Sequence, residues 1–111
     1  GFAVSLNEKI VGSEKLGFAG KLDELGVFGD GKLGLLDPKT TFYLYATTGI
    51  QLAGYALAGS EMGLFPKNVA RYGLHLHKTG DYTLQPFKDL SDFNIFLSLL
   101  NIAKWKENHR V

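Results

Sequence analysis

The sequence predicts an α/β fold in which helices pack on a central mixed β-sheet. Three features indicate this class: short apolar segments punctuated by glycine come first, an alanine- and leucine-rich stretch follows, and the chain ends in an amphipathic segment. A length of 111 residues suits one domain with a single modest core. We therefore expect one domain over residues 1–111, with the order strand–strand–strand–helix–strand–strand–helix.

The first three strands each have a local signal. FAVSL and KIVGS, on either side of Glu8, are typical strand segments, and the stretch from about Phe18 to Phe28 alternates well enough for a second strand. GDGK predicts a tight hairpin turn, because Asp30-Gly31 can adopt positive φ at little cost. KLGLLD predicts the third strand, which we expect Pro38 to end because proline has no N–H to donate.

The second half of the chain alternates helix and strand signals. GIQLAGYALAGSEMG predicts a helix capped by Thr47 or Thr48, and VARYGLHLHK and YTLQPF predict two strands around the turn TGD. The closing segment predicts a helix capped by Ser91 or Asp89. Its apolar positions are Phe93, Phe96, Leu97, Leu100 and Ala103.

Composition excludes several kinds of site. The absence of cysteine rules out disulfides, thiol nucleophiles and iron–sulfur clusters, and it fits a reducing compartment. No apolar run approaches the roughly 18 residues of a membrane span, and no signal peptide is recognisable, so we expect an intracellular protein without a membrane partner. The leading glycine indicates a processed or engineered start, and whether native residues precede it stays open.

The net charge of +1 neither requires nor excludes nucleic acid as a binding partner.

Two acids point to a metal site. Asp23 lies seven residues before Asp30 and Asp37 lies six residues after Gly31, so the hairpin brings their strands together with the two carboxylates nearly level. Two carboxylates in one buried place repel each other unless a cation joins them. Oxygen ligands suit Mg²⁺ or Mn²⁺, so the pair predicts a divalent cation site.

Further residues extend this site. Lys39 follows Asp37 by two positions and therefore points to the same strand face, where an ammonium can orient water or stabilise charge on a phosphoryl oxygen. Pro38 lies between them, and its carbonyl can supply another oxygen. Gln51 and Tyr55 share one face of the next helix at positions i and i+4.

These residues carry a family resemblance. GFAGKLDELGVFGDGKLGLLDPKT followed by QLAGY resembles the PD-(D/E)XK nuclease superfamily, and is most similar to its RecB-like and phage exonuclease branch. The matching motifs are G-x-x-D at Gly20 to Asp23, D-x-K at Asp37 to Lys39, and Q-x-x-x-Y at Gln51 and Tyr55. The resemblance extends from Glu8 to about Lys106 and implies a restriction-endonuclease-like core in a minimal version.

The resemblance also implies a function. The expected activity is that of a Mg²⁺- or Mn²⁺-dependent DNA nuclease, and more specifically of an exonuclease. Such an enzyme would act in DNA recombination, repair or phage replication, and in the host cytoplasm if the protein is viral. Asp23 and Asp37 would be metal ligands, Lys39 the catalytic lysine and Glu8 an accessory ligand. Gln51 and Tyr55 would contact DNA or support the lysine. Relatives carry an apolar residue other than proline at the position of Pro38.

Relatives also begin with a helix that this chain has no room for. Another segment or chain could supply it, or the protein could be a homo-oligomer. Whether the enzyme cuts DNA or RNA, from ends or internally, and with which strand polarity stays open.

Several alternatives stay beside this interpretation. Taken alone, Asp37-Pro38-Lys39 is a turn with a surface ion pair, and Gln51 with Tyr55 is an ordinary helix face. His75 and His77 alternate on one strand face, but we expect solvated or hydrogen-bonded side chains rather than zinc ligands. The leading alternative function is a catalytically inactive nucleic-acid-binding module with the same fold. A small β-rich ligand-binding or scaffold protein is a more distant one.

Overall fold

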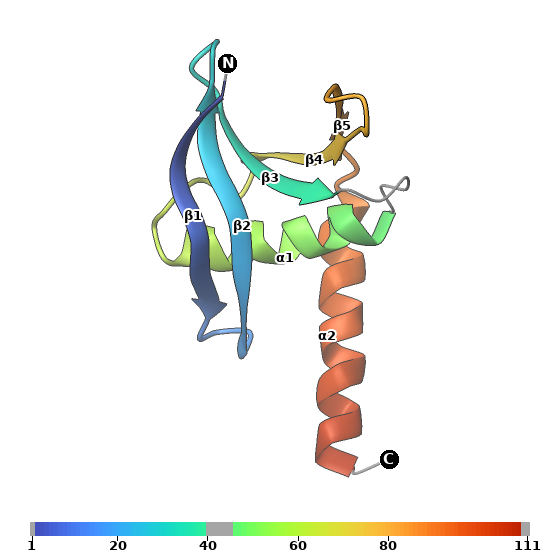
Figure 1. Cartoon of the computed structure of the whole chain (residues 1–111). Coiled ribbons are helices and arrows are strands. Elements are labelled where there is room, and N and C mark those ends of the chain that lie inside the picture. Colours follow the sequence, from blue (N-terminus) through green and yellow to red (C-terminus); the bar gives the residue numbers. More distant parts are fainter. Residues whose placement is uncertain (1, 40–45, 110–111) are drawn as a thin grey trace.

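The computed structural model describes residues 2–39 and 46–109, with the backbone alone at Lys39 and Ala46. The described elements follow the predicted order β-β-β-α-β-β-α, so the α/β fold class is confirmed (Figure 1). The strands are β1 (Phe2–Ser13), β2 (Phe18–Phe28), β3 (Leu33–Lys39), β4 (Ala70–Leu76) and β5 (Tyr82–Pro86), and the helices are α1 (Ala46–Glu61) and α2 (Ser91–His109).

The described strands form one 5-stranded sheet in the order β1-β2-β3-β4-β5. Neighbouring strands are antiparallel except for β3 and β4, which are parallel. Parallel neighbours need a crossover connection, and α1 provides it by running from the end of β3 back to the start of β4. The result is the mixed sheet that the sequence predicts.

Helix α1 covers one face of the sheet, and the core lies between them. Leu35 of β3 and Leu52 of α1 are almost completely inaccessible to solvent, and the small side chains of α1 allow the helix to approach the strands closely. Burying one leucine of this kind stabilises the fold by about 1.5–3 kcal/mol. The buried cluster consists of Val11, Leu22, Leu25, Leu35, Leu52, Ala56, Ala58, Phe65 and Val69.

Helix α2 crosses α1 and projects beyond the sheet (Figure 1). Gly54 of α1 permits the crossing, because a Cβ there would lie only 2.3 Å from the Phe96 ring. The Phe96 ring also meets that of Phe18, with centroids 4.9 Å apart. A glycine inside a helix is costly, and at Gly54 the close approach of α2 accounts for it.

Two local predictions need correction. Helix α1 begins at Ala46, so Thr47 and Thr48 lie in its first turn and are not its caps. Strand β3 does not end at Pro38 but runs through it to Lys39. At the start of α2 the structure agrees with Asp89 as the predicted cap, because the Asp89 Oδ1 accepts a hydrogen bond from the backbone N–H of Ser91 at 2.9 Å.

Candidate active site

The candidate site lies where β2 separates from β3. The ladder between these strands contains the pairs Leu25↔Leu35 and Glu24↔Leu36, and no further pair beyond Glu24 is formed within the described residues. The ladder thus stops one step short of Asp23 and Asp37, which one more pair of the same register would set opposite each other. Strand β3 meanwhile stays paired with β4, and the end of β3 is therefore held on one side only.

This one-sided pairing explains Pro38. The last pairs between β3 and β4 are Asp37↔Gly73, Pro38↔Leu74 and Lys39↔His75. On its other side this part of β3 has left β2, so a residue without an N–H costs the sheet no ladder bond there. Pro38 therefore lies inside a strand, at the point where one of its two ladders has stopped.

Asp37 faces the covered side of the sheet. Residues two apart on a strand share a face, and Leu35 belongs to the core beneath α1 while Leu36 lines the opposite face. Asp37 therefore points with Leu35 toward the α1 side, where it is only 4% exposed. A carboxylate with so little exposure is costly unless other groups compensate its charge. The side chain of Lys39, predicted to share this face, lies outside the described part of the structure.

Gln51 and Tyr55 contact each other on α1 as their spacing predicts. The Gln51 Nε2 donates a hydrogen bond of 2.7 Å to the Tyr55 hydroxyl. The Tyr55 ring lies against β2 at Gly20, since a Cβ on Gly20 would come within 2.8 Å of Tyr55 Cε1. The glycine of the G-x-x-D motif therefore makes room for the tyrosine of the Q-x-x-x-Y motif.

Glu8 lies on β1, level with Asp23 on the neighbouring strand β2. The pairs Asn7↔Glu24 and Lys9↔Leu22 flank them, and Glu8 itself has a φ of 52° that breaks the regular strand. The Glu8 Oε1 lies 3.9 Å from the Lys21 Nζ, with both side chains more than half exposed. An ion pair this exposed stabilises little. Glu8 therefore sits next to Asp23 in the register but in a solvent-exposed setting.

The donor set suits a cation that keeps much of its water. Within residues 2–39 and 46–109 there is no group of three or more His, Asp or Glu side chains placed to hold a metal ion. Two carboxylates, Asp23 and Asp37, and the carbonyl of Pro38 remain as oxygen donors. Mg²⁺ commonly binds through one or two carboxylates and keeps several waters, whereas zinc needs three or four protein ligands. The residues fit Mg²⁺ or Mn²⁺ better than a fully protein-ligated metal.

Sequence reasoning missed two buried polar side chains on β4. Arg71 is 4% exposed and His75 is 8% exposed, whereas His77 is exposed and its Nε2 lies 2.7 Å from the Thr83 hydroxyl. His75 is level with Lys39 in the parallel pair, which places its backbone beside the candidate site. The expectation of a solvated or hydrogen-bonded histidine agrees with His77, whereas His75 is buried with its ring against that of His77, at a centroid distance of 4.3 Å.

Arg71 joins both helices to the sheet. Its guanidinium donates to the carbonyl of Gly49 at 2.9 Å and to the Asp92 Oδ2 at 2.9 Å. It also donates to the carbonyl of Asp89 at 3.1 Å and lies 4.9 Å from the centroid of Phe93. Gly49 lies two residues before Gln51, so Arg71 fixes the end of α1 that carries the site.

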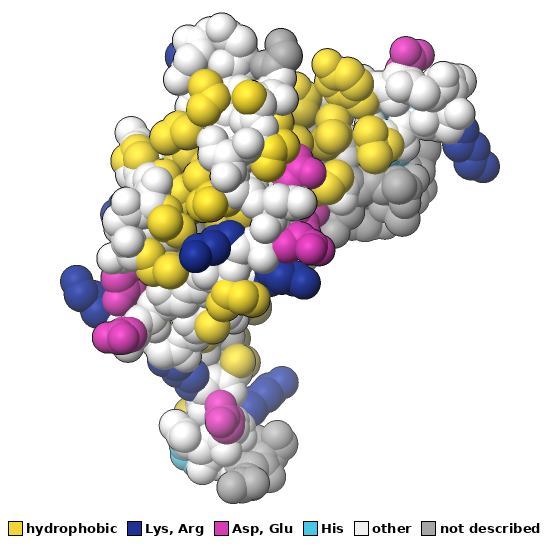
Figure 2. Space-filling model, turned by 60° about the vertical axis from the view of Figure 1, so that its left-hand side comes forward, with side chains coloured by type: hydrophobic (Ala, Val, Ile, Leu, Met, Phe, Trp, Pro, Cys, Tyr) yellow, Lys and Arg dark blue, Asp and Glu magenta, His cyan; other side chains and the backbone are white. Residues whose placement is uncertain are grey.

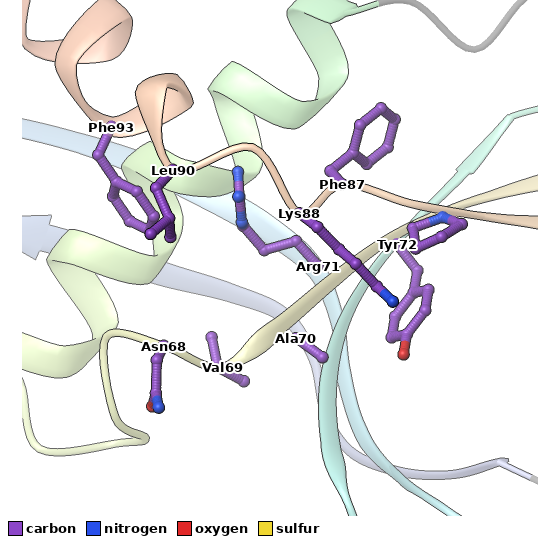
Figure 3. A pocket seen from close by; sticks show the side chains of 10 residues that line it. Asn68, Val69, Ala70, Arg71, Tyr72, Phe87, Lys88, Leu90 and Phe93 are labelled. Carbon is purple, nitrogen blue, oxygen red and sulfur yellow. The ribbon is translucent and has the colours of Figure 1, made fainter.

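A cavity of about 280 Å³ surrounds Arg71 between β4, β5 and the start of α2 (Figure 3). Figure 3 shows the Arg71 side chain rising toward the helices, with Lys88 and Tyr72 on the other side of the strand. None of the predicted site residues lines this cavity. The cavity therefore lies at the junction of the helices and not at the candidate site.

Two carboxylates outside the site have altered acidity. Hydrogen bonds from the Ser13 side chain and from the backbone of Lys15 hold the pKa of Glu61 below its usual value. The backbone N–H of Ser91 lowers the pKa of Asp89 in the same way. Both hydrogen bonds favour the charged form, so each carboxylate stays ionised to lower pH than in an unfolded chain.

Comparisons of the chain with known protein families and with curated proteins find no match. The family resemblance therefore stands on the motifs quoted above. Among the described helices, none is long and apolar enough to cross a membrane.

Proposed function

We propose that the protein is a metal-dependent deoxyribonuclease that hydrolyses phosphodiester bonds with Mg²⁺ or Mn²⁺. The observation that supports this proposal is the register of β2 and β3, whose last pair, Glu24↔Leu36, lies directly beside Asp23 and the buried Asp37 where the two strands part. Three elements then contribute the motifs of one nuclease site: β2 with Asp23, β3 with Asp37 and Lys39, and α1 with Gln51 and Tyr55.

Each side chain has a role in this proposal. Asp23, Asp37 and the Pro38 carbonyl hold the cation, and Glu8 is an accessory ligand through its position beside Asp23. Such a cation, when bound, supplies charge at the scissile phosphate and lowers the pKa of bound water. Lys39 stabilises negative charge on a phosphoryl oxygen.

Helix α1 contributes a hydrogen-bonded polar pair to the proposed site. A hydrogen bond joins Gln51 to Tyr55 at the surface of α1, and the tyrosine ring packs against Gly20. An amide and a phenol held in this way can contact the DNA backbone or orient Lys39. DNA end processing in recombination, repair or a phage life cycle is the setting that we propose, with exonuclease activity.

One observation favours the inactive nucleic-acid-binding module as a second candidate. The described residues offer no third carboxylate or histidine grouped with Asp23 and Asp37, and Glu8 is engaged with Lys21. A fold that kept its DNA-binding surface but lost a ligand would bind DNA without cutting it.

A cleavage assay separates the two candidates. Linear DNA with free or blocked ends and supercoiled circles would be incubated with Mg²⁺ or Mn²⁺ and with the wild type, Asp37→Ala or Lys39→Ala. Asp81→Ala and Lys78→Ala are matched controls on the exposed β4–β5 turn. We expect both site variants to lose at least about 100-fold in rate, as for removal of one charge-stabilising group, while the controls cleave normally.

The outcomes of this assay are distinct. DNA binding without cleavage by any of the proteins would support the module. Cleavage that survives both site substitutions would contradict the assignment of Asp37 and Lys39. Loss of cleavage on blocked ends alone would identify an exonuclease.

A further inference from the structure

The face of the sheet opposite α1 is apolar and uncovered in the described structure. A hollow of about 390 Å³ crosses all the strands, with Phe2 on β1, Phe28 on β2, Leu36 on β3, Leu74 on β4 and Leu84 on β5 along its floor. The rings of Phe2 and Phe28 lie edge to face, with centroids 4.7 Å apart. A sheet face of this composition is normally covered by another layer.

One carboxylate lines this apolar hollow. Glu24 of β2 lies at the edge of the hollow, with part of its surface covered. Figure 2 shows hydrophobic side chains gathered over the strands with acidic side chains among them. An occupant that covers the hollow must bring a cation to Glu24, because a carboxylate buried without one is strongly unfavourable.

Helix α2 has a second apolar face, which is about half exposed to solvent. Ile95, Leu99 and Ile102 are between 45% and 52% exposed, and with Lys106 they follow the spacing i, i+4, i+7 and i+11 of one helix face. The other face of α2 packs against α1 through Phe96. We call the first set, Ile95, Leu99, Ile102 and Lys106, the outer stripe.

The outer stripe matches the open face in length and in charge. From Ile95 to Lys106 the helix advances about 17 Å, and five strands span about 19 Å between the outermost axes. With Lys106 beside Glu24 on β2, Ile95 lies about 17 Å away along the helix and thus near β5, whose axis is about 14 Å from that of β2. The stripe therefore supplies both the apolar surface and the cation that the hollow requires.

The two surfaces of one chain cannot meet each other. Helix α2 packs on α1, which covers the opposite face of the same sheet (Figure 1). We propose that α2 of a second copy of this chain lies across the open face, with the Lys106 ammonium beside the Glu24 carboxylate. In a two-fold symmetric dimer, α2 of each copy covers the open sheet face of the other. Both contacts then form at once, and no open face remains to add a third copy.

Charge reversal tests this dimer independently of any nuclease activity. The full chain would be studied by sedimentation velocity and light scattering over a range of concentrations. Glu24→Lys and Lys106→Glu should each weaken dimerisation by roughly tenfold or more, since like charges then meet twice per dimer. The double variant Glu24→Lys/Lys106→Glu should restore it, whereas Glu107→Lys, outside the stripe, should leave it unchanged.

Single cysteines locate the contact, because the chain has no cysteine of its own. Ile95→Cys and Tyr82→Cys, both at exposed positions, should form a mixed disulfide when the two variants are combined and mildly oxidised. Ile10→Cys, equally exposed but on neither surface, should not join Ile95→Cys.

Three results would overturn the proposal. A monomer at every concentration would do so, as would a dimer that neither charge reversal affects. Efficient cross-linking between Ile95→Cys and Ile102→Cys without any to Tyr82→Cys would show that the helices pair with each other and leave the sheet open.

Discussion

Arg71 allows the sharpest prediction about stability. Its side chain is 3% exposed and that of Asp92 is 15% exposed, and the guanidinium makes hydrogen bonds to Asp92 and to the carbonyls of Gly49 and Asp89. Arg71→Met leaves a largely buried carboxylate and two carbonyls without their donor. Removal of one partner from a buried ion pair costs about 3–5 kcal/mol, a large share of the 5–15 kcal/mol typical of a whole domain.

The measurement is urea unfolding followed by circular dichroism and fluorescence. Arg71→Met should lower the free energy of unfolding by about 3–5 kcal/mol without changing the urea dependence. Arg71→Lys should lie between it and wild type, because lysine keeps the charge but cannot reach three acceptors with one planar group. Arg71→Met/Asp92→Leu should be more stable than Arg71→Met alone, since no unpaired carboxylate remains. A loss below about 1 kcal/mol in Arg71→Met would refute the view that this residue anchors both helices.

Two further predictions concern packing and pH. Gly20→Ala should lower the free energy of unfolding in urea by about 1–3 kcal/mol and slow DNA cleavage, because the added methyl group would lie 2.8 Å from the Tyr55 ring. The control Gly12→Ala, whose Cβ would have its nearest neighbour at 3.4 Å, should behave like wild type. Equal losses of stability in the two variants would contradict this prediction. Hydrogen bonds, of which that from the Ser13 side chain has the largest effect, hold the pKa of Glu61 below its usual 4.5 in the folded chain. The Glu61 carboxylate therefore stabilises the fold above pH 4.5, and this contribution is lost as the pH falls through the folded pKa. Thermal melts from pH 6 to pH 3 should therefore fall more steeply for wild type than for Glu61→Gln, and parallel curves would contradict the assignment.

The order of elements and the hairpin that joins β2 to β3 were accessible from the sequence. Both depend on local chemistry. The turn at Asp30-Gly31 sets the register, with Gly31 at a φ of 84° and the N–H of Phe28 bonded to the carbonyl of Lys32 at 2.9 Å. Once a tight turn fixes one pair, the register of the following pairs is set for as long as the ladder continues.

The role of Pro38 was not accessible in the same way. Proline does stop a ladder, but the sequence cannot tell which of two ladders a central strand loses. Here β3 leaves β2 and stays with β4, so the strand continues to Lys39. That outcome depends on β4, whose residues lie more than thirty positions further along the chain.

The burial of these polar residues likewise could not be predicted from the sequence. Arg71, His75 and Glu24 all lie in alternating strand patterns that look the same whether a face meets water or a helix. The burial of Arg71 is explained by partners that include Gly49 and Asp92, which come from two different helices. Such contacts depend on how the helices cross, and composition does not determine that.

The most direct test of the account is whether Asp23 and Asp37 together form a divalent cation site. Thermal melting with increasing Mg²⁺ or Mn²⁺ would be compared for the wild type, Asp23→Asn, Asp37→Asn and the exposed control Asp81→Asn. At a concentration of about 100 times the dissociation constant, binding stabilises the folded state by about 2.7 kcal/mol, which is roughly 10 °C for a domain of this size. We predict that shift for wild type and Asp81→Asn, and little or none for Asp23→Asn and Asp37→Asn. A wild type that neither ion stabilises, or site variants stabilised as much as wild type, would contradict the account.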